Sequence, residues 1–162
     1  MWTCVRTRPR WEKKFTGWLR ERRLNFFLPV LHRETVSGRK RRQMSIPLFP
    51  GYVFVEGECG KGDLDRTGMV VYVLKPRGIL EVAQLHNELW SVWCGLTSGL
   101  YVTPLQNLAV GERCVIRHGA LQGVPARFER VGRGGRIVLQ VDLMGGGLVV
   151  EVPPDAVEIG SM

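Results

Sequence analysis

The stretch that decides the fold runs from Ile46 to Glu56 and reads Ile-Pro-Leu-Phe-Pro-Gly-Tyr-Val-Phe-Val-Glu. In its second half, aromatic residues at positions 52 and 54 alternate with valines at positions 53 and 55. A period of two residues predicts a β-strand with two distinct faces. We expect the rest of the chain to be organised around this strand.

The first half of the same stretch predicts a stiff, extended lead-in. Pro47 and Pro50 lack amide hydrogens, and each favours extended geometry in the residue before it. Gly51 then gives the backbone freedom just before the strand. Because Phe49 stands between two prolines, its ring has little conformational entropy left to lose, which suits a docking surface. The alternative is a core strand with a tight start, since apolar residues usually serve the core.

Length and composition set the broad class. The 162 residues suffice for one domain or two small ones, and 44% hydrophobic residues allow a real core. The N-terminus has no signal-peptide pattern and no apolar run is long enough to span a bilayer, so we expect a soluble cytoplasmic protein. The four cysteines are widely spaced, which argues against a zinc site and a disulfide framework.

Positive charge is concentrated near the start of the chain. Residues 6–42 hold 13 Lys/Arg and 3 Asp/Glu, whereas residues 43–107 have a net charge of −2 and residues 108–162 are neutral. A localised basic face indicates a polyanionic partner, and a merely solvated surface is the alternative. Within this region, Arg39-Lys40-Arg41-Arg42 follows a Ser-Gly turn without aromatic neighbours. It fits a phosphate contact that lacks sequence preference, or else a solvated hairpin tip.

The first 99 residues alternate between strand and helix patterns. The expected strands are 2–6, 25–33, 43–46, 52–56 and 69–75, and the expected helices are 11–23 and 83–96, with one helical turn at 63–66. This order predicts an α+β fold in which an antiparallel sheet is flanked by helices. The apolar face of the second helix is expected to hold Leu85, Leu89, Val92, Trp93 and Leu96. Trp90 falls beside that face, so we expect it to be partly exposed.

After a short linker at residues 100–108, the pattern changes to short strands separated by glycine turns. The expected strands are 113–118, 125–131, 136–143 and 148–152, with a stub at 156–159. Five short strands within about 50 residues predict a small closed β-barrel. Pro125 and the three glycines at 145–147 oppose helix, so we expect this barrel to be constitutive.

Catalytic patterns are missing. The three histidines, His32, His86 and His118, are isolated, and there is no metalloprotease pair, nucleophile elbow or phosphate-binding loop. Asp63 and Asp65 alone are too weak a signal for a metal site. We therefore expect no enzyme activity, no metal and no cofactor.

Two motifs carry a family resemblance. The run Leu48-Phe49-Pro50-Gly51-Tyr52-Val53-Phe54-Val55 resembles the signature of the N-terminal domain of NusG-type transcription elongation factors, a family that includes the specialised paralogue RfaH. Residues 110–123 resemble the KOW motif, in which a strand enters a sharply reversing loop, here at Gly119, Leu121 and Gly123. The resemblance implies three parts: an RNA polymerase-binding domain at 1–99, a linker at 100–108 and a five-stranded SH3-like KOW barrel at 109–162.

The resemblance implies an elongation and antitermination factor that bridges the polymerase clamp to the opposing lobe and suppresses pausing or termination. The N-terminal domain would dock on the clamp helices of the largest catalytic subunit. The docking residues that carry over are Phe49, Pro50 and Tyr52, with Leu85, Leu89 and Trp90 from the second helix. The second polymerase contact would fall at Asp65, Arg66 and Thr67, which do not reproduce the His-Thr-Thr-Thr run of RfaH.

The same resemblance implies a DNA-facing side. Arg8, Arg10, Lys13 and Lys14 would face upstream or non-template DNA. Trp18 stands where RfaH has a helix histidine, so the sequence preference of RfaH is not transferred. The basic tip at residues 39–42 joins this set as a phosphate contact.

Partners and subclass follow from the family as well. The KOW barrel would recruit ribosomal protein S10 or termination factor Rho, and we expect a monomer. The protein is either a housekeeping factor or an operon-specific factor. The short linker and the lack of an acidic extension favour a specialised paralogue. The alternative reading is a ribosome-associated or RNA-binding KOW protein, which predicts a basic barrel, whereas this barrel is neutral.

Overall fold

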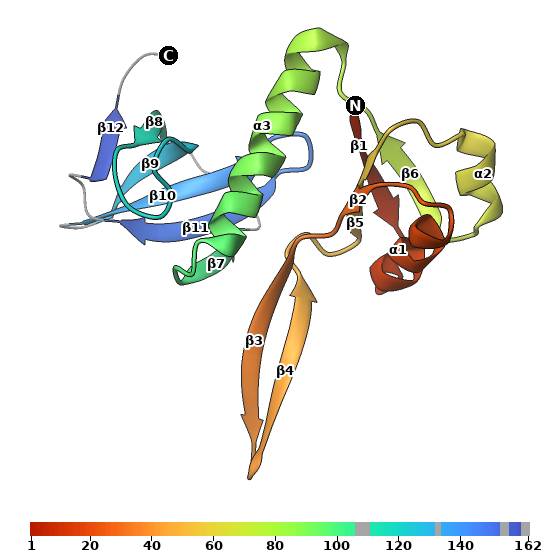
Figure 1. Ribbon diagram of the computed structural model, residues 1–162, viewed down its shortest axis with the longest axis horizontal. Helices are drawn as coiled ribbons and strands as arrows, with labels where there is room; N and C mark the ends of the chain where they lie inside the picture. The colour runs from red at the N-terminus through yellow and green to blue at the C-terminus, as the bar shows by residue number, and fades with distance from the viewer. Residues whose placement is uncertain (106–110, 132–133, 153–155, 160–162) are drawn as a thin grey trace. The chain divides into compact units, whose positions relative to one another are not determined.

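The computed structural model describes residues 1–105, 111–131, 134–152 and 156–159. The chain divides into two compact units, Met1–Val82 and Ala83–Met162 (Figure 1). Both units combine antiparallel sheet with helix, so the molecule is of the α+β class with a β-rich C-terminal region. The predicted domain limits at residues 99 and 109 stay predictions.

The first unit is built on a four-stranded antiparallel sheet with the order β2-β5-β1-β6. Its strands are β1 (Trp2–Thr7), β2 (Phe26–Phe27), β5 (Tyr52–Glu56) and β6 (Val70–Leu74). The predicted strand at 52–56 is confirmed, and it pairs with β1 from Trp2↔Glu56 to Arg6↔Tyr52. Its period of two sends Val53 and Val55 to one face of the sheet.

That face holds the hydrophobic core of the unit. Helices α1 (Glu12–Glu21) and α2 (Lys61–Arg66) supply the side chains that cover it. The fully or almost fully buried members are Val5, Phe15, Leu19, Val53, Val55, Leu64 and Met69. The apolar spacing on α1 is the reason for this arrangement, since Phe15 and Leu19 are four residues apart and share one side of the helix.

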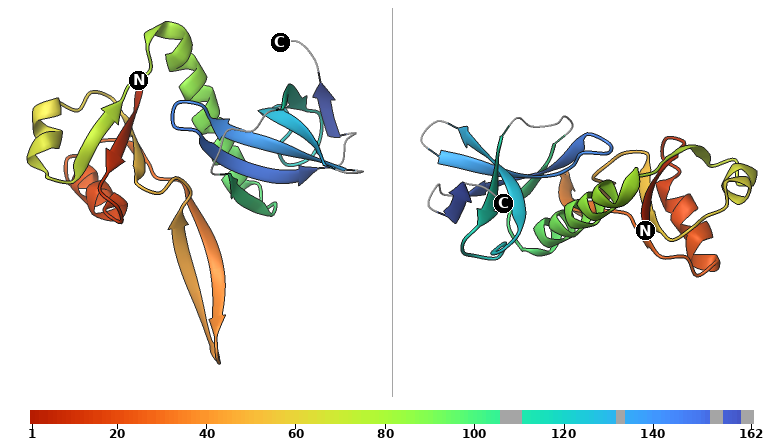
Figure 2. Two further views of the ribbon diagram at one scale, coloured as in Figure 1. Left: turned by 180° about the vertical axis from the view of Figure 1, so that it is seen from behind. Right: turned by 90° about the horizontal axis from the view of Figure 1, so that it is seen from above.

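A separate two-stranded hairpin projects from the first unit (Figures 1 and 2). It consists of β3 (Val30–Ser37) and β4 (Lys40–Pro47), joined through Gly38, whose φ is +61°. The sequence predicted one strand over 25–33, and this was wrong: the strand is divided between β2 and β3. Pro29 marks the break, because it cannot donate to a ladder and its carbonyl instead accepts a hydrogen bond from the Leu48 amide at 2.8 Å.

The second unit contains a six-stranded antiparallel sheet with the order β12-β8-β9-β10-β11-β7. Its strands are β7 (Val102–Leu105), β8 (Glu112–Ile116), β9 (Pro125–Val131), β10 (Gly134–Val141), β11 (Gly146–Val152) and β12 (Val157–Ile159). The five predicted strands are all present. The sixth, β7, lies inside the stretch that was expected to be a linker, and it pairs with β11 from Val102↔Val150 to Leu105↔Gly147.

Helix α3 (Gly78–Thr97) is longer than predicted and packs on this second sheet. Gly95 lies against the sheet: a Cβ built there would stand 2.7 Å from Leu139 Cδ1 and 3.2 Å from Leu148 Cδ1. Nearer the start of the helix, the Asp142 amide donates to Glu88 Oε2 at 3.1 Å. These contacts at residues 88 and 95 hold the part of α3 from Ala83 onward, which belongs to the second unit, against β10, β11 and the turn between them.

The exposed side of α3 differs from the prediction at one position. Trp93 was expected on the apolar face with Leu89, but 52% of it is exposed, whereas Leu89 is buried. The reason is angular: residue 93 lies about 100° further around the helix than Val92, which is fully buried. The partial exposure of Trp90 is confirmed at 45%.

Candidate docking and nucleic-acid surfaces

The turn before β5 is fixed by side chains from β1 and α1. The Gly51 amide donates to Glu12 Oε1 at 2.6 Å, and Glu12 is only 5% exposed. Arg6 Nη1 donates to the Pro50 carbonyl at 2.7 Å. Gly51 has a φ of +82°, and any side chain there would collide with the Arg6 guanidinium. The Pro50–Gly51 turn is therefore rigid, and it owes its rigidity to two residues that the sequence analysis did not select.

The three predicted docking residues in this segment are not equally accessible. Pro50 is exposed and Tyr52 is half-buried. Phe49 is buried, with 2% exposure, and its ring contacts Phe54 edge-on at a centroid distance of 5.8 Å. A partner that docks here therefore meets Pro50 and Tyr52, while a contact with Phe49 requires its ring to be uncovered.

Tyr52 is held by a charge on one side and a hydroxyl on the other. The Arg6 guanidinium carbon lies 4.6 Å from the centroid of the Tyr52 ring. The Tyr52 and Tyr72 hydroxyls are 3.0 Å apart, and this hydrogen bond is the main cause that raises the pKa of Tyr52 above its ordinary value. Tyr52 therefore presents a fixed, neutral, partly apolar surface beside Pro50.

The predicted docking residues on α3 belong to the second unit. Leu85 and Leu89 are buried there, at 2% and 3% exposure, and of the three only Trp90 reaches the surface. A surface contact from this helix is therefore available to Trp90 but not to the two leucines.

The predicted second polymerase contact lies at the end of α2. Asp65 and Arg66 are exposed. The Thr67 hydroxyl donates to the Leu64 carbonyl at 2.7 Å and accepts from the Met69 amide at 3.0 Å. The hydroxyl of Thr67 is thus used in capping the C-terminal end of α2. The exposed residues Asp65 and Arg66 are the ones that a partner can reach.

The predicted basic residues of the first helix fall into two groups. Arg8 and Lys14 flank the Trp11 ring, with their charged groups 5.9 Å and 4.3 Å from its centroid. Arg10 and Lys13 instead line a pocket on another side of the helix start. The sequence could not separate these four cations, although positions 13 and 14 differ by about 100° around a helix.

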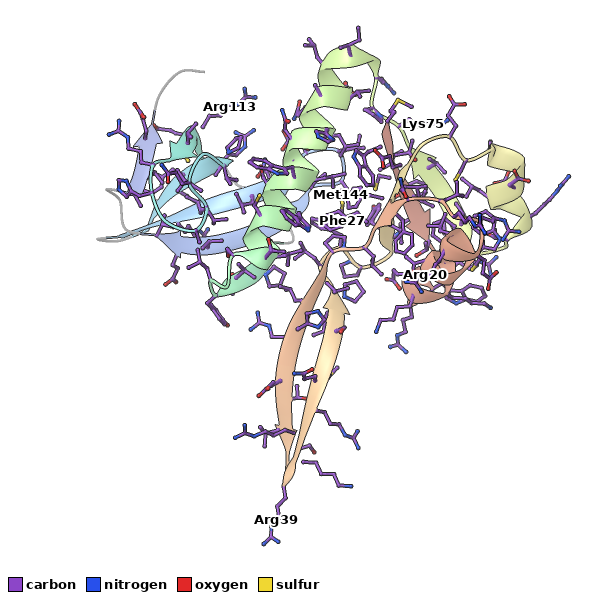
Figure 3. All side chains as sticks on the ribbon, in the orientation of Figure 1. Arg20, Phe27, Arg39, Lys75, Arg113 and Met144 are labelled. Carbon is purple, nitrogen blue, oxygen red and sulfur yellow. The ribbon has the colours of Figure 1, made fainter. Side chains whose placement is uncertain are left out.

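Trp18 is enclosed by its neighbours. Its ring stacks on Phe15 at a centroid distance of 5.8 Å and an interplanar angle of 13°, and the Arg22 guanidinium lies 4.0 Å from its centroid. A nucleic-acid base can stack on Trp18 only if Arg22 moves aside. Figure 3 shows Arg20 of the same helix extending into solvent.

The pocket beside Arg10 and Lys13 has a volume of about 430 Å³. This side of the pocket is completed by Arg6 at the end of β1, by Pro9 in the turn before the helix and by Glu12 of α1. The opposite side comes from the end of β4 and the turn before β5, at residues 46, 47, 50 and 51. No pattern in the sequence predicted this pocket. The one available signal was Glu12, an acidic residue in a strongly basic segment.

The basic tip of the hairpin is fully accessible. Arg39, Lys40, Arg41 and Arg42 are exposed, and none of them forms an ion pair with a residue that the structure describes. Figure 3 shows Arg39 pointing outward from the very tip. The register pairs Ser37 with Lys40 and Thr35 with Arg42, so Lys40 and Arg42 share one face of the ribbon while Arg41 lies on the other.

The predicted KOW loop connects β8 to β9. Gly119 and Gly123 have φ values of +91° and +80°, and the Gly123 amide donates to the Ile116 carbonyl at 2.8 Å. Leu121 is buried, with 2% exposure. These three residues therefore shape the loop, and the exposed side chains of the loop are those of the neighbouring residues 118, 120 and 122.

No helix among the described residues is long and apolar enough to cross a membrane. In the same part of the chain, no group of three or more His, Cys, Asp or Glu is placed to hold a metal ion.

The comparisons with known proteins identify the first unit. A family model described as transcription termination factor NusG matches residues 1–86, which is more than half of the 162 residues. No curated protein matches the chain. The matched region contains the sheet, α1, the hairpin and the Pro50–Gly51 turn described above. The chain therefore belongs to the NusG family, whose members are non-catalytic factors of transcription elongation and termination that bind RNA polymerase.

Proposed function

We propose that this protein is a polymerase-bound elongation and antitermination factor that bridges the clamp of the largest catalytic subunit to the opposing lobe and suppresses pausing or termination. The observation that carries the proposal is the Pro50–Gly51 turn of a NusG-type domain, held rigid by Glu12 and Arg6. A surface that loses little entropy on binding is favourable for docking.

The clamp contact is centred on Pro50 and Tyr52, with Phe49 behind them. Trp90 on α3, in the second unit, is a separate exposed aromatic residue for a polymerase contact, while Leu85 and Leu89 are buried on the same helix. The contact with the opposing lobe is made by the loop at residues 65–67, where Asp65 and Arg66 are the exposed members.

Upstream or non-template DNA lies along the basic surface of the same domain. The contacts come from Arg8 and Lys14 beside Trp11, from the edge of Trp18, and from the hairpin tip at residues 39–42. Because these cations meet no acidic partner in the described chain, they are available to phosphates. Arg10 and Lys13 line the pocket instead and are not part of this DNA-facing set.

The second unit acts as a KOW domain with an SH3-like barrel that recruits ribosomal protein S10 or Rho. The consecutive antiparallel order β12-β8-β9-β10-β11 and the loop with left-handed glycines support this assignment. A specialised NusG paralogue that works as a monomer in the cytoplasm is the form we favour. The neutral charge of residues 108–162 disfavours the alternative, an RNA-binding or ribosome-associated KOW protein.

The test is the capture of purified core RNA polymerase by the tagged full chain. Tyr52→Ala should lower the affinity at least tenfold, since an aromatic anchor contributes about 2 kcal/mol or more. The matched control is Tyr72→Phe, which removes the same hydroxyl–hydroxyl hydrogen bond but leaves the rings of both tyrosines in place. Phe49→Ala is unsuitable because Phe49 is buried and its loss would test folding instead. Equal capture of wild type and Tyr52→Ala would refute the assigned docking face.

A further inference from the structure

We propose that the pocket beside α1 binds a carboxylate-bearing side chain of RNA polymerase, with Arg10 and Lys13 as the groups that hold the carboxylate. The inference rests on the proposed function, because it takes the polymerase as the partner. It goes beyond that function by assigning a second, electrostatic anchor next to the apolar contact at Pro50 and Tyr52.

The location of the pocket links it to the docking turn. Pro50 and Gly51 form one side of the pocket, so a segment that packs on Pro50 has the opening directly beside it. Its volume of about 430 Å³ falls in the range of sites that enclose small groups. All of the lining residues belong to the first unit.

Arg10 is held in a backbone conformation that arginine rarely adopts. Its φ is +67°, in a turn closed by a hydrogen bond of 3.1 Å from the Trp11 amide to the Arg8 carbonyl. Pro9 occupies the second position of this turn and Arg10 the third, where a positive φ normally calls for glycine. Observed backbone strain of this kind points to a functional side chain.

The other non-glycine residue with a positive φ needs no such explanation. Arg23, with φ of +56°, stands just past the end of α1, a position where helices commonly adopt the left-handed conformation. Arg10 precedes the helix, so no helix ending accounts for it. The strained backbone at Arg10 therefore has no explanation in helix geometry, and it places a guanidinium group at the pocket.

The charges around the pocket leave two cations unused. The carboxylate of Glu12 is occupied by the Gly51 amide, and the Arg6 guanidinium is occupied by the Pro50 carbonyl. Arg10 and Lys13 are exposed and form no ion pair with any residue that the structure describes. With three cations against one carboxylate, the pocket attracts an anion.

The remaining lining favours a protein carboxylate over a nucleotide. Ile46, Pro47 and Pro50 give the pocket an apolar side, and none of its lining residues is aromatic. Sites that hold unpaired bases usually offer aromatic rings for stacking. An Asp or Glu with its aliphatic stem matches an apolar side next to two cations, and Arg10 can bind a carboxylate in the bidentate manner.

The experiment measures two affinities for the full chain: for core RNA polymerase without nucleic acid, and for fluorescein-labelled single-stranded and duplex DNA. The test variants are Arg10→Gly and Lys13→Gln. The matched control is Lys14→Gln, the adjacent helix position beside Trp11. We expect both test variants to bind polymerase about tenfold more weakly, as for loss of a charge-assisted contact, and to keep DNA affinity within about twofold.

The control should show the opposite pattern, with polymerase affinity within about twofold of wild type and weaker DNA binding. Because Arg10→Gly relieves the positive φ, its melting temperature should equal or exceed that of wild type, which excludes unfolding as the cause of lost affinity. If the test variants lose DNA affinity but keep polymerase affinity, the occupant is a nucleic acid and the inference fails. It also fails if they bind both as wild type does.

The two proposals can be told apart. If wild type binds polymerase and the pocket variants bind equally well, only the pocket assignment is lost. If wild type does not bind polymerase at all, the proposed function fails and the pocket assignment fails with it.

Discussion

At the scale of single residues, the carboxylate of Glu12 holds the Pro50–Gly51 turn in place. Glu12 is one of only three acidic residues among positions 6–42, and its buried carboxylate accepts the Gly51 amide at 2.6 Å. Glu12→Ala would leave this buried amide without a partner, at a cost of about 1–3 kcal/mol. We expect a lower free energy of unfolding for the full chain, measured by urea denaturation.

The matched control for this prediction is Glu21→Ala on the last turn of the same helix. Glu21 is exposed, so its replacement should change the free energy of unfolding by less than about 0.5 kcal/mol. If Glu12→Ala is as stable as Glu21→Ala, the carboxylate does not hold the turn. The rigidity argued for Pro50 would then lose its physical basis.

At the scale of elements, two helical glycines give opposite predictions. Gly17 on α1 has no atom within 4 Å of the place that an added methyl group would occupy, whereas a Cβ on Gly95 of α3 would meet Leu139 Cδ1 at 2.7 Å. Gly17→Ala should therefore stabilise the chain by about 0.5–1 kcal/mol through helix propensity. Gly95→Ala should destabilise it by about 1 kcal/mol or more, because overpacking outweighs that gain.

Thermal denaturation of the two alanine variants is the measurement. Both variants add one methyl group to a helical glycine, so only the surroundings of that methyl group differ between them. Stabilisation by Gly95→Ala would show that α3 does not rest closely on β10 and β11.

The contact between α3 and the second sheet also predicts a pH dependence. Burial raises the pKa of Glu88 above its ordinary value of 4.5, with the charge of Asp142 adding to the effect and the hydrogen bond from Gln84 opposing it. Between the unfolded and the folded pKa, the folded state binds more protons. Stability from this group is therefore present at low pH and is lost as the pH rises through the folded pKa.

Glu88→Gln removes this titration while keeping one oxygen that can accept the Asp142 amide. We expect the free energy of unfolding of the variant to fall less than that of wild type as the pH rises from 4.5 to about 7, as measured by urea denaturation. The other acidic groups titrate in both proteins, so the difference between the two curves isolates Glu88. Parallel curves would contradict the burial of this carboxylate.

The elements also show which features the sequence can predict. Strand β5 and the glycines at 119 and 123 were predictable because alternation and left-handed turns are local properties. Strand β7 was not, because Pro104 normally argues against a strand. It is tolerated here since β7 is at the edge of the sheet, where a missing amide breaks no ladder.

In the candidate site, too, some features could be predicted from the sequence and others could not. The Pro-Gly turn and the basic segment were visible as patterns, so the docking turn and the charged tip could be selected. The pocket could not, because it depends on Arg6, Arg10 and Ile46 meeting from distant parts of the chain, and on a positive φ at Arg10 that no residue pattern predicts.

At the scale of the whole molecule, charge is divided unevenly between the two units. Residues 6–42 hold 13 Lys/Arg and 3 Asp/Glu, whereas residues 108–162 are neutral. The ion pairs among the described residues, Arg117–Glu158, Arg127–Asp142 and Arg136–Glu129, all lie in the second unit. Cations that are already paired have little to offer a phosphate, and residues 108–162 carry no net charge, so nucleic-acid binding should depend mainly on the first unit.

The salt dependence of DNA binding tests this division. Replacing the four basic residues at 39–42 with glutamine removes up to four phosphate contacts. The slope of log K against log salt should then become shallower by as much as about 0.9 for each contact on duplex DNA and about 0.7 on single strands. Fluorescence anisotropy of labelled DNA at several salt concentrations measures the slope.

The control removes charge from the other unit through Arg113→Gln together with Arg117→Gln. Arg117 is paired with Glu158 at 2.8 Å and Arg113 lies outside the basic segment, so this variant should keep the wild-type slope if DNA binds the first unit. An unchanged slope in the hairpin variant would mean that the tip is only solvated. A slope that becomes shallower in both variants, in proportion to the four charges removed in one and the two removed in the other, would mean that DNA is held by the overall charge of the molecule. Contacts confined to the hairpin cannot respond to a change in the second unit.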